Sequence, residues 1–377
     1  MKVEKQEMNI NQLAFFELLR AGLWEKEARL SVFDGIDFNE VYRLAEEQSV
    51  VGLVAAGMEH VTDVKIPQTT FLFFVGNAIQ IEQRNKAMNA FVAELIERLR
   101  KADIYVILVK GQGIAQCYER PLWRACGDVD LLLSEANYKK AKALLMSLAD
   151  SVEDEDEERN HLAMTINGWV VELHGTLRSQ LGKRIDNVID ETQNDTFQFG
   201  NVRVWQNEKV AVYLPSPNND MIFVFCHILQ HFFRGGIGLR QICDWCRLLY
   251  TYKDTLNHNL LESRLSKAGL MSEWKAFAAL AVVYLGMPIE VIPFYSDSSR
   301  WKRKASRVMD LVLETGNFGN NRDYSYQKKY PYVVYKAISL WRHTKDGLRH
   351  FSLFPDVAAR EWWRMLKHGI HVASEGK

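Results

Sequence analysis

The sequence predicts an α+β fold that is mainly helical and contains one small mixed β-sheet. Apolar residues recur at helical spacing before residue 100 and after residue 214, and three short apolar runs rich in strand-forming residues lie between these regions. With 377 residues, 47% of them hydrophobic, the chain can build two or three compact units. We expect an N-terminal helical region over 1–100, an α/β core over 101–213 and a C-terminal helical domain over 214–377.

The N-terminal region carries two helical patterns separated by a break. The first runs from residue 9 to 62 and begins with Leu13, Phe16 and Leu19. The stretch DVKIPQTT interrupts it. From 71 to 101, apolar residues at a spacing of four indicate one long helix.

The core region alternates strand and helix patterns. IYVILV (104–109), DVDLLL (128–133) and GWVVELHG (168–175) are short apolar runs typical of buried strands. Residues 114–119 and 134–150 between them favour helices. This alternation predicts a mixed sheet covered by helices. After LPSPNND the chain is helical nearly to its end, with expected helices over 218–233, 238–252, 257–268, 272–286, 299–315, 331–343 and 355–370.

Charge and composition argue against several classes of protein. Lys plus Arg and Asp plus Glu both number 47, so zero net charge makes a long nucleic acid a poor partner. The first residues lack the apolar core of a signal peptide, and the longest apolar stretch, Ala276–Met287, is too short to cross a bilayer. We therefore expect a cytoplasmic protein without a membrane partner. The CxxC pair Cys243 and Cys246 is best explained as two core residues, with zinc binding the weaker alternative.

Two aspartates stand at the start of the apolar run DVDLLL. Side chains alternate faces along a strand, so Asp128 and Asp130 share a face with Cα atoms about 6.5–7 Å apart. A buried charge without a partner is costly, which points to a solvated strand end or a bound cation. Glu172 is a third acid within a strand, with His174 on its face, and it joins the aspartates if the two strands are neighbours. Such a set suits magnesium, which combines a few carboxylates with substrate phosphates.

A glycine-containing turn, VKGQG, follows the first expected strand. Gly111 and Gly113 would let backbone N–H groups approach a phosphate, and a following helix favours negative charge. Lys110 and Arg124 add positive charge nearby. Such a turn is a weak signal alone and a more specific one beside the two aspartates and the later acid.

Together these motifs resemble the polymerase β-type nucleotidyltransferase superfamily. More narrowly, LVKGQGIAQCYERPLWRACGDVDLLL resembles a bacterial nucleotidyltransferase-like family of largely uncharacterised members. The likeness continues in RNHLAMTINGWVVELHGTL and GLRQICDWCRLL, more faintly in ETGNFGN and FSLFPDVAAREWW, and the N-terminal LAEEQSVVGLVAAG also fits it. It covers most of the chain from about residue 100 onward.

The resemblance implies a nucleotidyltransferase core and a set of site residues. Asp128, Asp130 and Glu172 would be catalytic and would hold magnesium or manganese. The turn departs from the superfamily's usual Gly-Gly or Gly-Ser, which leaves the phosphate contacts open. The residues expected to bind the nucleotide are Lys110, Gly111, Gly113, Arg124, His161, His174, Arg240 and Asp244.

Plainer interpretations exist for several of these residues. The two aspartates could cap a loop or pair with Arg124, and Glu172 could be a core acid paired with an arginine. His161 and His174 could equally have core roles. Arg240 and Asp244, four residues apart on a helix, could form a surface ion pair of little consequence.

Two further patterns favour structural roles. His227 and His231 have a spacing that can bind zinc, but no acid lies between them as in the protease motif, so helix packing explains them better. The acidic run Glu153–Glu158 is best explained as a solvated loop.

The sequence thus predicts transfer of a nucleoside monophosphate from a nucleoside triphosphate to an acceptor hydroxyl. The acceptor, a small molecule, a sugar or a protein, is not determined, and neither is the oligomeric state. Without cations the three carboxylates would repel one another, so an Asp130→Asn variant should hold or gain stability. The alternative is a catalytically inactive nucleotide-binding or protein-interaction scaffold of the same fold, which the missing Gly-Ser turn favours.

Overall fold

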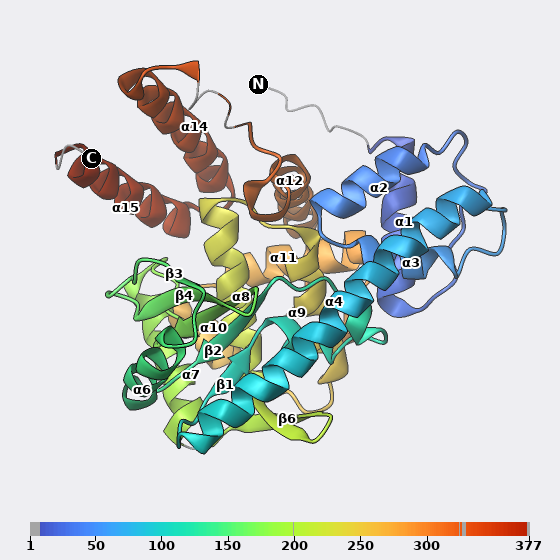
Figure 1. Cartoon of the computed structure of the whole chain (residues 1–377). Helices are drawn as coiled ribbons and strands as arrows, with labels where there is room; N and C mark the ends of the chain where they lie inside the picture. Colours follow the sequence, from blue (N-terminus) through green and yellow to red (C-terminus); the bar gives the residue numbers. More distant parts are fainter. Residues whose placement is uncertain (1–7, 199, 324, 326–328, 375–377) are drawn as a thin grey trace.

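The architecture is α+β and mainly helical. A computed structural model describes residues 8–198, 200–323, 325 and 329–374, so the first seven residues of the expected N-terminal region lie outside it. The structure is 61% helical, with one five-stranded mixed sheet and one two-stranded sheet, which confirms the predicted fold class. In Figure 1 the long helix α4 runs from the N-terminal helices down across the sheet region.

The five-stranded sheet has the order β1-β2-β5-β4-β3. β2 and β5 are parallel neighbours, and the other three pairings are antiparallel. Its strands are β1 (Ile107–Val109), β2 (Asp128–Leu132), β3 (Ser151–Val152), β4 (His161–Ile166) and β5 (Trp169–His174). The two-stranded sheet is the hairpin β6 (Val202–Asn207) and β7 (Val210–Pro215), and β7 packs against β1.

The three expected strands are present as β1, β2 and β5, whereas the sequence reasoning missed β3, β4 and the β6–β7 hairpin. A signal for β4 was available in Asn167-Gly168, which joins β4 to β5. Both residues have positive φ, 51° and 76°, and Asn-Gly is the pair that two-residue hairpin turns favour. Expected boundaries also shifted, since β1 begins at Ile107 and α5 (Gly111–Ala115) starts directly after Lys110.

The N-terminal region folds into four helices: α1 (Ile10–Trp24), α2 (Phe38–Glu47), α3 (Val51–Met58) and α4 (Gln68–Lys101). Two glycines let α1 and α3 approach closely. A Cβ at Gly22 would lie 1.8 Å from the carbonyl oxygen of Leu53, and one at Gly57 would lie 1.9 Å from that of Leu18. α4 has 34 residues, which corresponds to a length of about 50 Å.

The remaining helices cover the sheet and build the C-terminal part. They are α6 (Glu135–Met146), α7 (Lys183–Gln198), α8 (Pro217–Arg234), α9 (Leu239–Thr251), α10 (His258–Ala268), α11 (Met271–Leu285), α12 (Ser299–Thr315), α14 (Tyr332–Leu353) and α15 (Pro355–Ser374), with short 3-10 turns η1 (Pro121–Trp123), η2 (Ile289–Val291) and η3 (Asn317–Gly319). All seven expected C-terminal helices are present, and α14 runs ten residues further than expected. α7 was missed, because two threonines complete the buried face begun by Ile185 and Val188.

Two hydrophobic cores hold these elements. The larger core lies among the helices and takes side chains from all three expected regions, for example Phe15, Ile107 and Phe225. The smaller core lies under the five-stranded sheet and includes Val129 and Leu131. α4 contributes to both. The division at residues 100 and 213 therefore stays a prediction.

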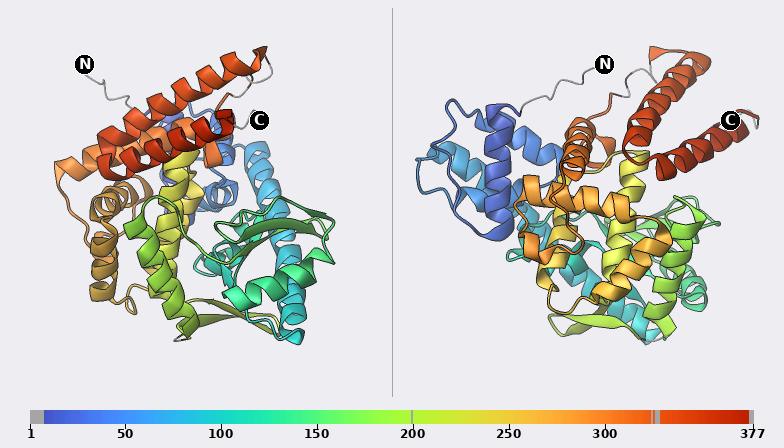
Figure 2. Two further views of the ribbon diagram at one scale, coloured as in Figure 1. Left: turned by 90° about the vertical axis from the view of Figure 1, so that its left-hand side faces the viewer. Right: turned by 180° about the vertical axis from the view of Figure 1, so that it is seen from behind.

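The C-terminal helices α14 and α15 lie side by side and project from the body of the molecule (Figure 2). Several of their apolar side chains are exposed, including Trp341 and Trp363. Among the helices that the structure describes, none has the length and apolar character needed to cross a membrane.

A buried asparagine on α4 fixes the segment that leads into β2. Asn85 is 1% exposed, and its amide nitrogen donates 2.8 Å hydrogen bonds to the carbonyl oxygens of Leu122 and Arg124. Its side-chain oxygen accepts a 2.8 Å hydrogen bond from Gln112 of α5. One side chain thus joins α4, α5 and the loop before the two aspartates.

We predict that Asn85→Ala lowers the free energy of unfolding by at least about 2 kcal/mol, because it leaves buried hydrogen-bonding groups without partners. Urea unfolding of the purified variant measures this. Gln83→Ala is the matched control, since Gln83 is exposed on the same helix, and its effect should stay within about 0.5 kcal/mol. Equal midpoints for the two variants would contradict the assigned role of Asn85.

Candidate active site

The three acidic residues predicted from the sequence come together at β2 and β5. Asp130 lies directly beside Glu172 in the parallel pairing of these strands, and Asp128 lies beside Val170. Val129, between the aspartates, points into the core under the sheet and is 1% exposed. All three carboxylates line one cavity of about 280 Å³, whose other walls come from α8, α9 and the turn after β1.

Asp130 is the most deeply buried of the three acids and is held by two cationic or hydrogen-bonding groups. Its Oδ1 lies 2.8 Å from Nζ of Lys110 and 2.7 Å from Nε2 of His174. Burial opposes ionisation of this carboxyl, but Lys110 and His174 outweigh it and lower the pKa. Burial also opposes the charged form of Lys110 and so lowers its pKa, but the charges of Asp130 and Glu172 outweigh burial, and the net result is a raised pKa.

Lys110 has an unusual backbone conformation, with φ 57° and ψ −148°. A positive φ is strained for a residue with a side chain and persists only where the surroundings enforce it. Val109, the residue before it, pairs with Asp130 across β1 and β2. The strained turn therefore delivers the ammonium group of Lys110 to Asp130.

Glu172 is surrounded by two histidines. Its Oε2 lies 3.1 Å from Nε2 of His161 and 3.4 Å from Nε2 of His174. Burial alone would raise the pKa of this carboxyl, but the hydrogen bonds from the two rings lower it well below its usual range. The interpretation of Glu172 as a core acid paired with an arginine is therefore wrong, and His161 and His174 both lie at the acidic cluster.

Asp128 differs from its neighbours because its carboxylate has no hydrogen-bond or ion-pair partner in the part of the chain that the structure describes. The charge of Asp130 raises its pKa first of all, and burial and Glu172 add to this. The expected mutual repulsion among the acids thus applies to Asp128. The charge of Glu172 also acts to raise the pKa of Asp130, but Lys110 and His174 outweigh this repulsion.

Arg124 is engaged elsewhere. Its Nε and Nη2 lie 3.0 and 2.5 Å from the two carboxylate oxygens of Asp244, which also accepts a 2.8 Å hydrogen bond from the hydroxyl of Tyr118. The suggestion that the aspartates pair with Arg124 is wrong. Arg124 and Asp244 both line the cavity, but each holds the other and leaves little capacity for a ligand.

Arg240 also lines the cavity, so the alternative of a surface ion pair with Asp244 is wrong. Its Nη1 donates a 3.0 Å hydrogen bond to the carbonyl oxygen of Ala125, while its buried Nε has no partner in the described part of the chain. Burial, together with the charge of Arg124, lowers the pKa of Arg240. A buried guanidinium that lacks a full set of partners has capacity for an anionic ligand.

The two glycines of the turn differ in their surroundings. Gly111 lines the cavity, has φ +40°, and a Cβ there would lie 3.2 Å from Sγ of Cys126. Gly113 is not among the cavity residues, and a Cβ there would lie 2.8 Å from a methyl group of Leu214. The absence of a side chain at Gly113 is therefore explained by packing against β7, not by an approach to phosphate.

Two histidines that the sequence assigned to packing lie at the site. His227 and His231 of α8 were assigned to helix packing, whereas both line the cavity, with ring centroids 4.4 Å apart. Burial lowers the pKa of both, and for His231 to about 4 with a further contribution from Lys110, so both rings are neutral at pH 7. Phe318, from the stretch ETGNFGN, also lines the cavity and was missed.

The other candidate clusters lie outside this cavity. In the acidic run, Glu155 binds Lys142 and Tyr138, which attaches the run to α6. Cys243 and Cys246 are fully buried on α9, and the metal-capable group found among the described residues does not include them.

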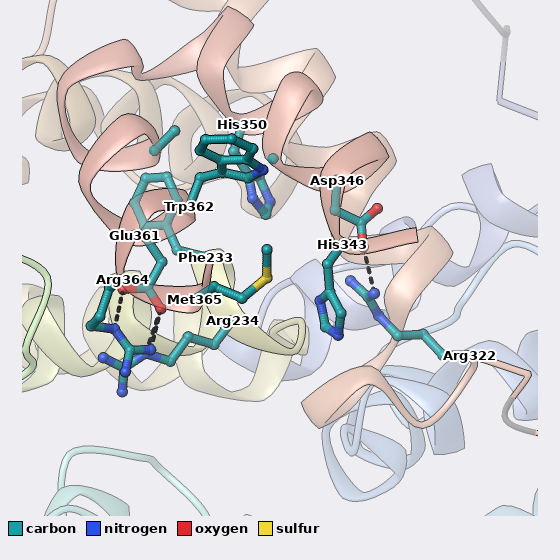
Figure 3. Close-up of a pocket in the computed structure, with 12 residues that line it drawn as sticks. Phe233, Arg234, Arg322, His343, Asp346, His350, Glu361, Trp362, Arg364 and Met365 are labelled. Carbon is teal, nitrogen blue, oxygen red and sulfur yellow. Dashed lines mark hydrogen bonds and ion pairs between the residues drawn. The ribbon is translucent and has the colours of Figure 1, made fainter. Parts of the chain in front are cut away.

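A second cavity, of about 210 Å³, lies between the end of α8 and helices α14 and α15 (Figure 3). Its arginines are already paired: Arg234 lies 2.9 Å and Arg364 2.5 Å from Glu361, and Arg322 lies 2.5 Å from Asp346. The Arg234–Glu361 and Arg322–Asp346 pairs attach the C-terminal helices to the body, whereas Arg364–Glu361 lies within α15. None of the site residues predicted from the sequence lines this cavity.

Residues 34–286, more than half of the chain, match a protein family described as "Uncharacterised nucleotidyltransferase". The chain belongs to this family. The matched segment includes β1, β2 and β5 and every residue of the acidic cluster. Neither the search of curated proteins nor the search of solved structures found a match.

The donor atoms of the acidic cluster fit a hard divalent cation. Asp128 offers a carboxylate without a protein partner, and Asp130 and Glu172 add oxygens on the same side of the sheet. Magnesium favours such oxygen ligands and keeps further positions for substrate phosphates. Lys110 competes for one oxygen of Asp130, so these acids do not form a preassembled all-protein cage.

Opposite pKa shifts at the two aspartates predict opposite effects of neutralising them. For Asp128 the folded pKa is raised, so its ionised form destabilises the fold as pH rises above the unfolded pKa of about 3.9. We predict that Asp128→Asn melts at a higher temperature than wild type at pH 7 in chelator, with the difference fading on acidification.

Asp130→Asn should melt at a lower temperature than wild type at pH 7, which corrects the expectation from sequence that this variant holds or gains stability. Its folded pKa is lowered, so the ionised form stabilises the fold above about pH 3.9, and the stabilisation is lost as pH falls through the folded pKa. Thermal melts of both variants from pH 3 to 8 measure this. If both variants changed the melting temperature in the same direction at pH 7, the assignment of Lys110 and His174 as partners of Asp130 but not of Asp128 would be contradicted.

Proposed function

We propose that this protein transfers a nucleoside monophosphate from a nucleoside triphosphate to an acceptor hydroxyl. Asp128, Asp130 and Glu172 would hold Mg²⁺ or Mn²⁺, and the chemistry would be that of the polymerase β-type superfamily. Membership of an uncharacterised nucleotidyltransferase family supports the reaction class. The observation that carries the proposal is the β2–β5 register, which puts Asp130 beside Glu172 with Asp128 on the same face.

The positive groups of the cavity support a triphosphate as the donor. Lys110 and Arg240 approach the acidic cluster from the turn after β1 and from α9, and the Nε of Arg240 lacks a partner among the described residues. Ligand sites commonly measure about 300–1,000 Å³, so a cavity of about 280 Å³ would take the phosphates. The nucleoside and the acceptor would then extend beyond it.

In the reaction, the acceptor oxygen would form a bond to the α-phosphorus while the bond to pyrophosphate breaks. A bound divalent ion would supply Lewis-acid stabilisation of the charge on the reacting phosphate. Lys110 and Arg240 would hold the phosphates. The hydroxyl proton would pass to one of the three acids or to the neutral ring of His231.

The acceptor class is a small molecule, a sugar or a protein. Zero net charge argues against a long nucleic acid. A nucleoside triphosphate donor is consistent with work in the cytoplasm, which we propose as the location.

One observation favours a second candidate, a catalytically inactive nucleotide-binding scaffold. The ammonium group of Lys110 already binds Asp130 at 2.8 Å, in the position where a metal ligand is needed. In such a scaffold Lys110 would replace the cation permanently. The nucleotide would then bind without being consumed.

We predict that wild-type protein releases pyrophosphate from a nucleoside triphosphate with magnesium and a cell extract that supplies the acceptor. Asp128→Asn should reduce the rate by orders of magnitude, because metal ions contribute several kcal/mol to the transition state. This variant separates catalysis from folding, since the same change is expected to raise stability.

Asp154→Asn serves as the matched control, because Asp154 is an exposed acid in the run outside the cavity, and its rate should equal that of wild type. Equal rates for wild type and Asp128→Asn would refute the assigned site. A magnesium-dependent thermal shift with nucleotide, but no pyrophosphate release with any extract, would favour the scaffold.

A further inference from the structure

We propose that His161, Glu172 and His174 form a site for a divalent transition-metal ion such as Zn²⁺ or Co²⁺. The site shares Glu172 with the proposed magnesium cluster but does not depend on nucleotidyl transfer. One ligand atom from each residue, two ring nitrogens and one carboxylate oxygen, lies within 4.8 Å of the other two.

The spacing of the three ligand atoms matches a shared ion. Two atoms bound to one ion at about 2.0–2.2 Å lie about 3.0–3.5 Å apart. Nε2 of His161 lies 3.1 Å and Nε2 of His174 3.4 Å from Oε2 of Glu172. Small adjustments of rotamers would bring all three onto one ion.

The sheet holds these side chains in place. His161 and His174 are direct partners in the antiparallel β4–β5 pairing, and their ring centroids are 4.8 Å apart. Glu172 lies two residues before His174 and therefore on the same face of β5. The tight Asn167-Gly168 turn fixes the register, so the ligands stand on a rigid hairpin.

The donor set selects the class of ion. Imidazole nitrogen suits zinc and other first-row transition metals, whereas magnesium prefers oxygen ligands. Two histidines and one glutamate are also a known set for catalytic zinc, which keeps further positions for water or substrate. Asp128 and Asp130 offer oxygens alone, so the two sets differ in preference.

A metal ion can reach this site from solvent, and its binding changes the proton held by His174. The side chains of His161 and Glu172 are each 25% exposed, whereas that of His174 is 6% exposed. Nε2 of His174 lies 2.7 Å from Asp130, and a nitrogen that binds a metal cannot also donate a proton. Metal binding therefore removes that hydrogen bond and releases any proton on Nε2 to solvent, while Lys110 stays on Asp130.

The test is equilibrium dialysis of the full-length, chelator-treated protein against Zn²⁺ without nucleotide. We expect one zinc per chain, retained in a large excess of Mg²⁺. His161→Gln should weaken binding by at least about 10–100-fold, the loss seen when even an outer partner of a ligand is removed. His161 is partly exposed, so this variant is expected to fold, which circular dichroism checks.

His60→Gln is the matched control. Nε2 of His60 lies 2.5 Å from Glu25, and this pair does not belong to the metal-capable group among the described residues. Its zinc affinity should equal that of wild type. Co²⁺ provides a second readout: visible d–d bands without a sulfur charge-transfer band are expected, because the ligands include no cysteine.

Absence of zinc binding, equal affinity in wild type and His161→Gln, or displacement by Mg²⁺ would each overturn the inference. A sulfur charge-transfer band would do so too, by assigning the ion to the cysteines. Pyrophosphate release without zinc binding would leave the proposed function standing and remove only this site. Zinc binding without pyrophosphate release would support this metal site and remove the proposed function.

Discussion

The parallel pairing of β2 with β5 puts Asp130 beside Glu172, and much of the surrounding structure compensates for the charge that results. Two neighbouring carboxylates with a third on the same face would repel one another in a buried cavity. Lys110 and His174 offset the charge of Asp130, and the two histidines stabilise Glu172. Only Asp128 is left without a partner among the described residues, and its raised pKa reflects that remaining repulsion.

These compensating groups need support from elements far away in the sequence. The strained backbone at Lys110 is enforced by β1 on one side and by α5 on the other. The loop before β2 is joined to α4 through Asn85 and to α9 through the buried pair Arg124–Asp244. The helical regions on either side of the sheet therefore line the cavity and support the residues within it.

The sequence identified the acids but not their partners, and the reason is physical. The alternation of side chains along a strand is local, so the shared face of Asp128 and Asp130 could be read directly. The pairing of β2 with β5 joins residues more than forty positions apart, and Glu172 entered only on the condition that those strands are neighbours. The sequence reasoning missed β4, so it offered no means of pairing His161 with His174. His227 and His231 were assigned to packing because spacing alone does not tell a buried face from a cavity wall.

Asp128 and Asp130 look equivalent in the sequence, yet the structure gives them different electrostatic roles. Asp130 is 3% exposed and already neutralised, whereas the half-buried Asp128 carries an unpaired charge on the cavity wall. In the proposed function, a divalent ion that entered alone would gain Asp128 readily but would have to compete with Lys110 for Asp130. A triphosphate would change this balance, because its negative charge would offer Lys110 and Arg240 a new partner and leave the oxygens of Asp130 to the ion. The proposed reaction would therefore favour joint binding of metal and nucleotide over binding of either one alone.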